Sequence, residues 1–302
     1  MGAALCASPP LLHPALTGRA VVLPELRAAC AEAVARLLRF GPELVVVVGP
    51  APVTGEWGPD EWFDPAAFAP GVGSGRAAVS GATAGGAAVS GTAVSGTASG
   101  GTGRGLLPLP LGLGAMLLDQ GGYRGPRRLI AVGQDEPTGT CAALGAEIAT
   151  GAARTALLVM GDGSARRTLK APGHLDPRAE PFDAHVERAV RAGRLGALLD
   201  LDEALARDLM VTGRPAWQVL AGAMPDGAGA NGSGADDGGM AGSGADGAGV
   251  VGGEVAAAGV DGALATEVLY RDDPFGVAYL VACLYSRFNS ARYRGPKPTE
   301  KG

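Results

Sequence analysis

The sequence predicts an α/β fold, with a mostly parallel or mixed central sheet and helices on both faces. Short apolar runs such as LVVVV at residues 44–48 and TALLVM at residues 155–160 are typical of strands buried on both sides. These runs alternate with segments of helical periodicity. Alternation of this kind favours a parallel sheet covered by helices.

The expected elements follow one another in this order. Residues 5–12 begin with a short strand, which Pro9 and Pro10 end because proline donates no hydrogen bond to a strand ladder. Apolar residues at helical spacing predict a helix over residues 26–40, and Gly41 is a suitable stop. Further helices are expected over residues 113–120, 141–150, 182–192, 195–209 and 217–224. Further strands are expected over residues 127–132, 265–270 and 277–285.

Glycine is abundant, at 51 of the 302 residues, and much of it lies in two low-complexity tracts. The tracts at residues 71–105 and 225–262 lack large side chains. They cannot offset the entropy of ordering, so we expect disordered Gly/Ala-rich insertions there. The remainder is expected to form a single domain over residues 1–286, followed by a flexible basic tail at residues 287–302.

Charge and hydropathy exclude several partner classes. The net charge is −5 and no long basic run is present, which argues against nucleic-acid binding. No apolar stretch is long enough to span a bilayer, and the N-terminal residues do not resemble a signal peptide. The four cysteines form no CxxC pair and are expected to be buried thiols. These features favour a cytoplasmic protein with neither a membrane nor a nucleic-acid partner.

Three loops follow expected strands at their carboxyl ends, where α/β proteins usually bind ligands. They span residues 8–13, 49–54 and 161–174, and they are expected to converge. The third begins with the polar motif GDGSARR, whose glycine N–H groups, hydroxyl and arginines suit a carboxylate or phosphate. A tight turn explains the same motif if Ser164 bonds local backbone and the arginines pair with Asp176 or Glu180. The turn is the preferred interpretation, since short Gly/Ser turns are common.

Five segments together resemble the class III extradiol ring-cleavage dioxygenase family, specifically its B-type subunits. In chain order they read CASPPLL, VVVVGPAP, MGDGSARR, GRPAWQVLAGAM and PFGVAYLVA. The resemblance extends from residue 5 to residue 283 and depends on the order and spacing of the set. It implies the fold of that family, with its site at the three loops.

For active members, the resemblance implies a non-haem Fe(II) held by two His and one Glu, with a further His as acid/base. The two His positions correspond to Ser8 and Ala51, the acid/base position to Ala165, and the Glu position to Gly213. None of these side chains replaces an imidazole or a carboxylate on iron. The resemblance therefore implies the fold, while the residues argue against ring cleavage and against an iron cofactor.

We expect a catalytically degenerate family member, with no assigned catalytic residue, that keeps a pocket for a small aromatic or anionic ligand. The residues expected to line this pocket are Ser8, Pro9, His13, Pro50, Ala51, Gly161, Asp162, Ser164, Arg166 and Gly213.

Two alternatives remain open. One is an active metal-dependent dioxygenase with rearranged ligands, His13, Asp162 and His174, whereas His185 is expected on a solvated helix face. The other is a protein-interaction scaffold, including a homo-oligomer, in which the aromatic loop from Trp57 to Phe68 supplies the contact surface.

Overall fold

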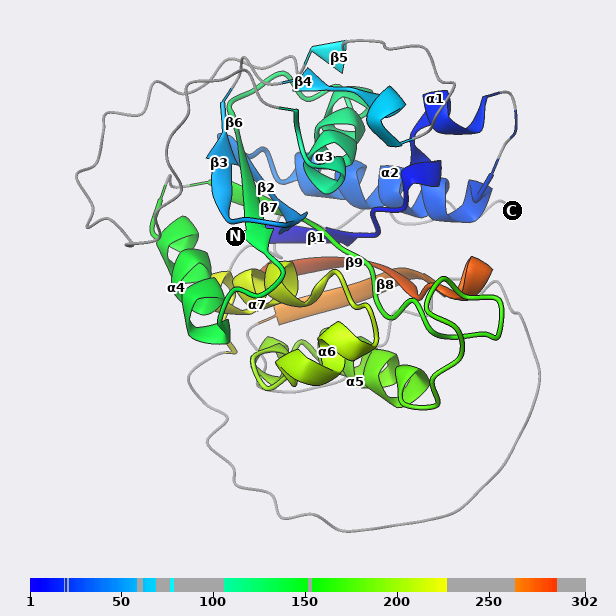
Figure 1. Cartoon of the computed structure of the whole chain (residues 1–302). Coiled ribbons are helices and arrows are strands. Elements are labelled where there is room, and N and C mark those ends of the chain that lie inside the picture. The colour runs from blue at the N-terminus through cyan, green and yellow to red at the C-terminus, as the bar shows by residue number, and fades with distance from the viewer. Residues whose placement is uncertain are drawn as a thin grey trace, which may run out of the picture.

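The strands of the computed structural model form a mixed seven-stranded sheet in the order β3-β6-β2-β7-β1-β9-β8 (Figure 1). The structure describes residues 1–18, 20, 22–58, 62–68, 77–78, 106–151, 154–226 and 264–286. The four central strands run parallel: β6 (Arg127–Gly133), β2 (Leu44–Ala51), β7 (Thr155–Met160) and β1 (Gly2–Cys6). The flanking strands are antiparallel: β3 (Gly55–Trp57), β9 (Tyr279–Ser286) and β8 (Leu264–Asp272). The predicted α/β class with a mixed sheet is confirmed.

Helices cover both faces of this sheet (Figure 1). One face carries α2 (Pro24–Arg39) and α3 (Leu109–Gln120). The other carries α4 (Thr138–Ala149), α5 (Ala179–Ala192), α6 (Glu203–Asp208) and α7 (Arg214–Ala223). Short elements complete the described set: α1 (Pro14–Thr17), η1 (Pro10–Leu12), η2 (Pro65–Phe68), η3 (Leu195–Leu198) and η4 (Pro274–Gly276).

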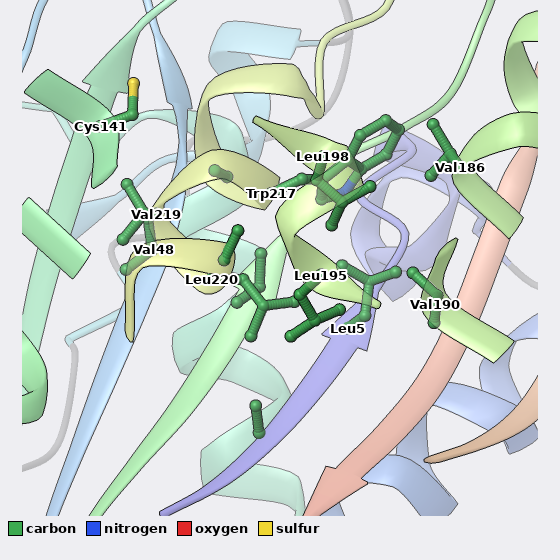
Figure 2. Packing of buried hydrophobic residues seen from close by; sticks show 14 of the residues in the cluster. Leu5, Val48, Cys141, Val186, Val190, Leu195, Leu198, Trp217, Val219 and Leu220 are labelled. Carbon is green, nitrogen blue, oxygen red and sulfur yellow. The ribbon is translucent and has the colours of Figure 1, made fainter. Parts of the chain in front are cut away.

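Each face of the sheet has its own apolar core. The α2/α3 core contains Cys6, Val47 and Met160 together with leucines of the two helices. In the α5/α7 core, Trp217 lies among aliphatic side chains such as Leu198 and Val186 (Figure 2). The four cysteines are free and buried, as expected.

Strand β2 shows why a uniformly apolar run forms a strand here. The valines at residues 45–48 are fully buried and alternate between the two cores. Successive side chains of a strand point to opposite faces, so both must be apolar when both faces are covered. The strand continues to Ala51, so residues 49–51, which were expected in a loop, belong to the sheet.

Several expected boundaries are wrong. Strand β1 begins at Gly2 and ends at Cys6, before the proline pair. The single helix expected over residues 195–209 is divided into η3 and α6, because the Asp202 carboxylate accepts a hydrogen bond from Leu205 N at 2.8 Å and caps a new helix. Helix α3 begins at Leu109, earlier than expected, with proline in its first turn.

The expected insertions and tail lie almost entirely outside the described residues. Ala77–Ala78 forms β5, which pairs with β4 (Trp62–Phe63) in a two-stranded sheet. Of the helices in the described ranges, none has the length and apolar character needed to cross a membrane.

Candidate functional site

The carboxyl ends of β1 and β7 bring Ser8 and Asp162 into contact. The parallel register pairs Cys6 with Met160, and Gly161 N donates to Cys6 O at 3.0 Å. Two residues beyond the strand, Ser8 N donates to Asp162 Oδ1 at 2.7 Å. The expected convergence of residues 8–13 with residues 161–174 is therefore present at this point.

The register of the neighbouring strands extends this contact into a row across the sheet edge. The pairing of β2 with β7, continued by three residues, places Ala51 level with Asp162. The antiparallel pairing of β1 with β9, continued likewise, places Tyr279 level with Ser8. Ala51 and Tyr279 both belong to the α2/α3 core. Because strand side chains alternate, Ser8 and Asp162 fall on that same face.

Asp162 is a partly buried carboxyl group without a cationic partner. Burial raises the pKa of Asp162 from 3.8 to about 7, against the opposing effect of two hydrogen bonds from the backbone and side chain of Ser8. No cation among the described residues contributes to this pKa. A carboxyl group that titrates near neutrality at the end of a central strand is typical of functional sites.

Tyr279 completes the polar part of the row, and the sequence prediction missed it. Its side chain is 5% exposed. Burial raises the pKa of the Tyr279 phenol, and the nearby Asp162 charge raises it further. Its hydroxyl oxygen is not among the fully buried side-chain atoms that lack a hydrogen-bond partner in the described structure. The available sequence signal for Tyr279 was its position near the start of an expected strand. That position does not give the register of the strand against β1, so the sequence could not place Tyr279 beside Ser8.

Gly161 and Gly213 allow the backbone of α7 to approach the site. Gly213 N donates to Asp162 O at 2.8 Å, and Asp162 N donates to Thr212 Oγ1 at 3.2 Å. A Cβ on Gly161 would lie 2.5 Å from Gly213 Cα. A Cβ on Gly213 would lie 2.3 Å from two ring carbons of Trp217. The indole thus occupies the space that any side chain at position 213 would need.

Ser164 does not contribute to this site, contrary to expectation. Its side chain is fully buried, and both its N–H and its hydroxyl donate to the Asp183 carboxylate of α5. Burial raises the pKa of Asp183, while these hydrogen bonds oppose the shift. The neighbouring Ala165 is buried, and its N–H donates to Leu209 O at 3.0 Å.

The arginines of the motif do not pair with Asp176 or Glu180. Arg167 Nε lies 2.8 Å from Asp273 Oδ2, and Asp176 pairs instead with Arg178. Arg166 packs against Gly173, and its buried Nε has no hydrogen-bond partner among the described residues. The turn interpretation is wrong: residues 161–164 form no turn, and the partners of Asp162, Ser164 and Arg167 come from distant segments.

Pro9 and Pro50 are buried at the same sheet edge: Pro9 O accepts a hydrogen bond from Leu12 N, and Pro50 pairs with Val132 inside the sheet. Their backbones shape the strand ends. They contribute no polar side chain to the site.

His13 and His174 each bond to nearby backbone, and His185 faces solvent. His13 Nδ1 accepts a hydrogen bond from Ala15 N, and its ring centroid lies 5.2 Å from that of Phe63. His174 is exposed, with φ of 62°, and its Nδ1 accepts from Leu175 N; His185 is exposed on α5. Among the described residues, no group of three or more His, Cys, Asp or Glu is arranged to hold a metal ion. The alternative ligand set of His13, Asp162 and His174 is not assembled.

Of the described aromatic side chains in the loop, Phe63 and Trp57 pack inward. Phe63 is buried and stacks on Phe68, with ring centroids 5.6 Å apart. Trp57 lies in β3 and packs against the α2/α3 core. Phe68 is 37% exposed. These contacts show the aromatic side chains covering the edge of a core.

Comparison with known proteins adds little to this picture. No family model and no curated protein matches the sequence. Among solved structures, the crystal structure of the uncharacterized protein JW3007 from Escherichia coli K12 resembles this chain with a TM-score of 0.46 and 14% identity. The match covers 95% of this chain and 100% of that one.

Proposed function

We propose that this chain is a divergent class III extradiol dioxygenase-like protein, similar to the B-type subunits, that lacks ring-cleavage activity and binds a small molecule beside Asp162. The observation that supports this is the placing of the residues at three of the ligand positions. Ser8 bonds to Asp162, Ala51 lies level with it on β2, and Gly213 N donates to its carbonyl oxygen. Ser8 and Ala51 lie beside Asp162 on the face of the α2/α3 core, and the backbone of Gly213 reaches Asp162 from the α7 side of the sheet.

The side chains at these positions do not fit Fe(II). A facial iron site needs two imidazoles and one carboxylate, and Ser8, Ala51 and Gly213 supply none of these groups. A glutamate at position 213 would also overlap the indole of Trp217, which packs in the α5/α7 core. Asp162 supplies one carboxylate at this edge of the sheet, and one carboxylate alone does not make a facial iron site.

Oxygen consumption tests the proposed loss of activity. The purified chain is incubated anaerobically with Fe(II), freed of unbound metal, and mixed with catechol in an oxygen electrode. We expect the uptake rate to equal that of a protein-free blank. Catechol-dependent uptake that rises in proportion to protein concentration would overturn the proposal.

A further inference from the structure

We propose that the site at the carboxyl edge of β1 and β7 takes a small molecule bearing a hydrogen-bond donor, an amine or a hydroxyl group. The donor group is held between the Asp162 carboxylate and the Tyr279 hydroxyl. This inference rests on the proposed function, in that it assumes the site still binds a small molecule. The inference specifies the chemistry of the ligand, which the proposed loss of the iron site does not determine.

The first reason is the incomplete bonding of the Asp162 carboxylate. An ionised carboxylate has about four lone-pair sites. The backbone N–H and the hydroxyl of Ser8 fill two of them. A partly buried carboxylate without a cation is costly, and a donor from a ligand would complete its bonding.

The second reason is the Tyr279 hydroxyl, which belongs to a side chain more than nine-tenths buried. Its oxygen is not one of the fully buried polar atoms left without a partner, and it lies near enough for the Asp162 charge to affect it. A phenol both donates and accepts. A ligand amine or hydroxyl that donates to Asp162 therefore has a second polar contact available on the same face of the sheet.

The third reason is the placement of positive charge. Arg167 is committed to Asp273, and its Nε also lies 3.9 Å from Asp183 Oδ2. Neither Arg166 nor Arg167 forms an ion pair with Asp162 in the described structure. An anionic ligand beside Asp162 would meet a like charge without a compensating cation. The anionic ligand expected from the GDGSARR motif is thus disfavoured at this edge.

The same face adjoins the α2/α3 core. Met160 and Leu111 are fully buried there, and Ala51 is 7% exposed, so any accessible surface lies at the polar row itself. A small ligand with one donor group suits a site of this limited extent.

Three probes of similar size separate the possible ligand chemistries: benzylamine, benzyl alcohol and benzoate. Their binding to the full chain is measured near pH 8, where Asp162 is mostly ionised, by titration calorimetry or ligand-observed NMR. We expect benzylamine and benzyl alcohol to bind and benzoate not to bind; the stronger of the first two identifies a cationic or a neutral donor. Asp162→Asn should weaken benzylamine binding by about tenfold or more, because a charge-assisted hydrogen bond is lost.

Asp135→Asn is the matched control, because Asp135 is exposed and pairs with Arg207 on the surface. It should leave binding of all three probes unchanged. Tyr279→Phe is the second variant and should weaken benzyl alcohol binding by a few-fold, whatever the folding yield of Asp162→Asn.

Benzoate binding as tight as benzylamine, or unchanged benzylamine binding in Asp162→Asn, would overturn the inference while leaving a small-molecule site in place. Failure of all three probes would overturn both the inference and the proposed pocket. Neither result bears on oxygen uptake, which tests the loss of ring cleavage separately.

Discussion

Asp162→Asn should stabilise the chain near pH 8 and leave its stability almost unchanged near pH 4. Burial raises the pKa of Asp162 from 3.8 to about 7 in the folded chain. In the unfolded chain this group loses its proton near 3.8, so the unfolded state binds fewer protons between these two values. The stability contribution of a raised pKa is fully present below the unfolded value and is lost as pH rises through the folded value.

The size of the stabilisation expected for Asp162→Asn follows from the shift in the pKa of Asp162. A shift of about three units at about 1.36 kcal/mol each corresponds to about 4 kcal/mol. Asp162 is partly exposed and solvent screens its charge, so we expect a gain of about 2–4 kcal/mol for the asparagine variant at about pH 8. Asparagine keeps an oxygen for the hydrogen bond from Ser8 N.

Urea denaturation of both chains at about pH 4, 6 and 8 measures this difference in unfolding free energy. Asp176→Asn is the contrasting control, because Arg178 lowers the pKa of Asp176 to about 2. A lowered pKa gives stability that is present at neutral pH and lost on acidification, so that variant should show the opposite trend. An equal gain for Asp162→Asn at pH 4 and pH 8 would refute the reasoning.

Two further predictions concern the residues around the site. Gly213→Ala should lower the unfolding free energy by about 1–3 kcal/mol, because its Cβ would overlap Trp217; the control Gly139→Ala, which meets nothing within 4 Å, should be neutral or slightly stabilising. An unchanged thermal midpoint for Gly213→Ala would contradict the packing described. Ser164→Ala should cost about 1–3 kcal/mol in denaturant unfolding, because Asp183 loses a buried donor, and no loss would show that bond to be dispensable.

The sequence predicted the fold well where one physical signal dominated. The uniform valines at residues 45–48 could only suit a strand covered on both sides, and the apolar stripe of Pro24–Arg39 suited one helix on one core. It failed at boundaries, where local caps decide. Helix η3 ends at Leu198, and the Asp202 side chain starts a new helix a few residues later; apolar periodicity does not reveal such a break.

Part of the site was also predicted, where a single physical signal was again sufficient. The contact of Ser8 with Asp162 follows from two adjacent parallel strands ending at one edge. The Tyr279 position depends on the register of an antiparallel strand more than 100 residues further along the chain. The bond between Ser164 and Asp183 depends on how α5 packs. Tertiary packing determines these partners, and the local patterns of a single sequence do not reveal them.

The most direct measurement is the iron content of the purified chain after anaerobic incubation with Fe(II) and passage through a chelating column. We predict far less than one iron per chain, because Ser8, Ala51 and Gly213 carry no imidazole or carboxylate. Retention of about one iron per chain, with affinity that survives the chelator, would contradict the loss of the metal site.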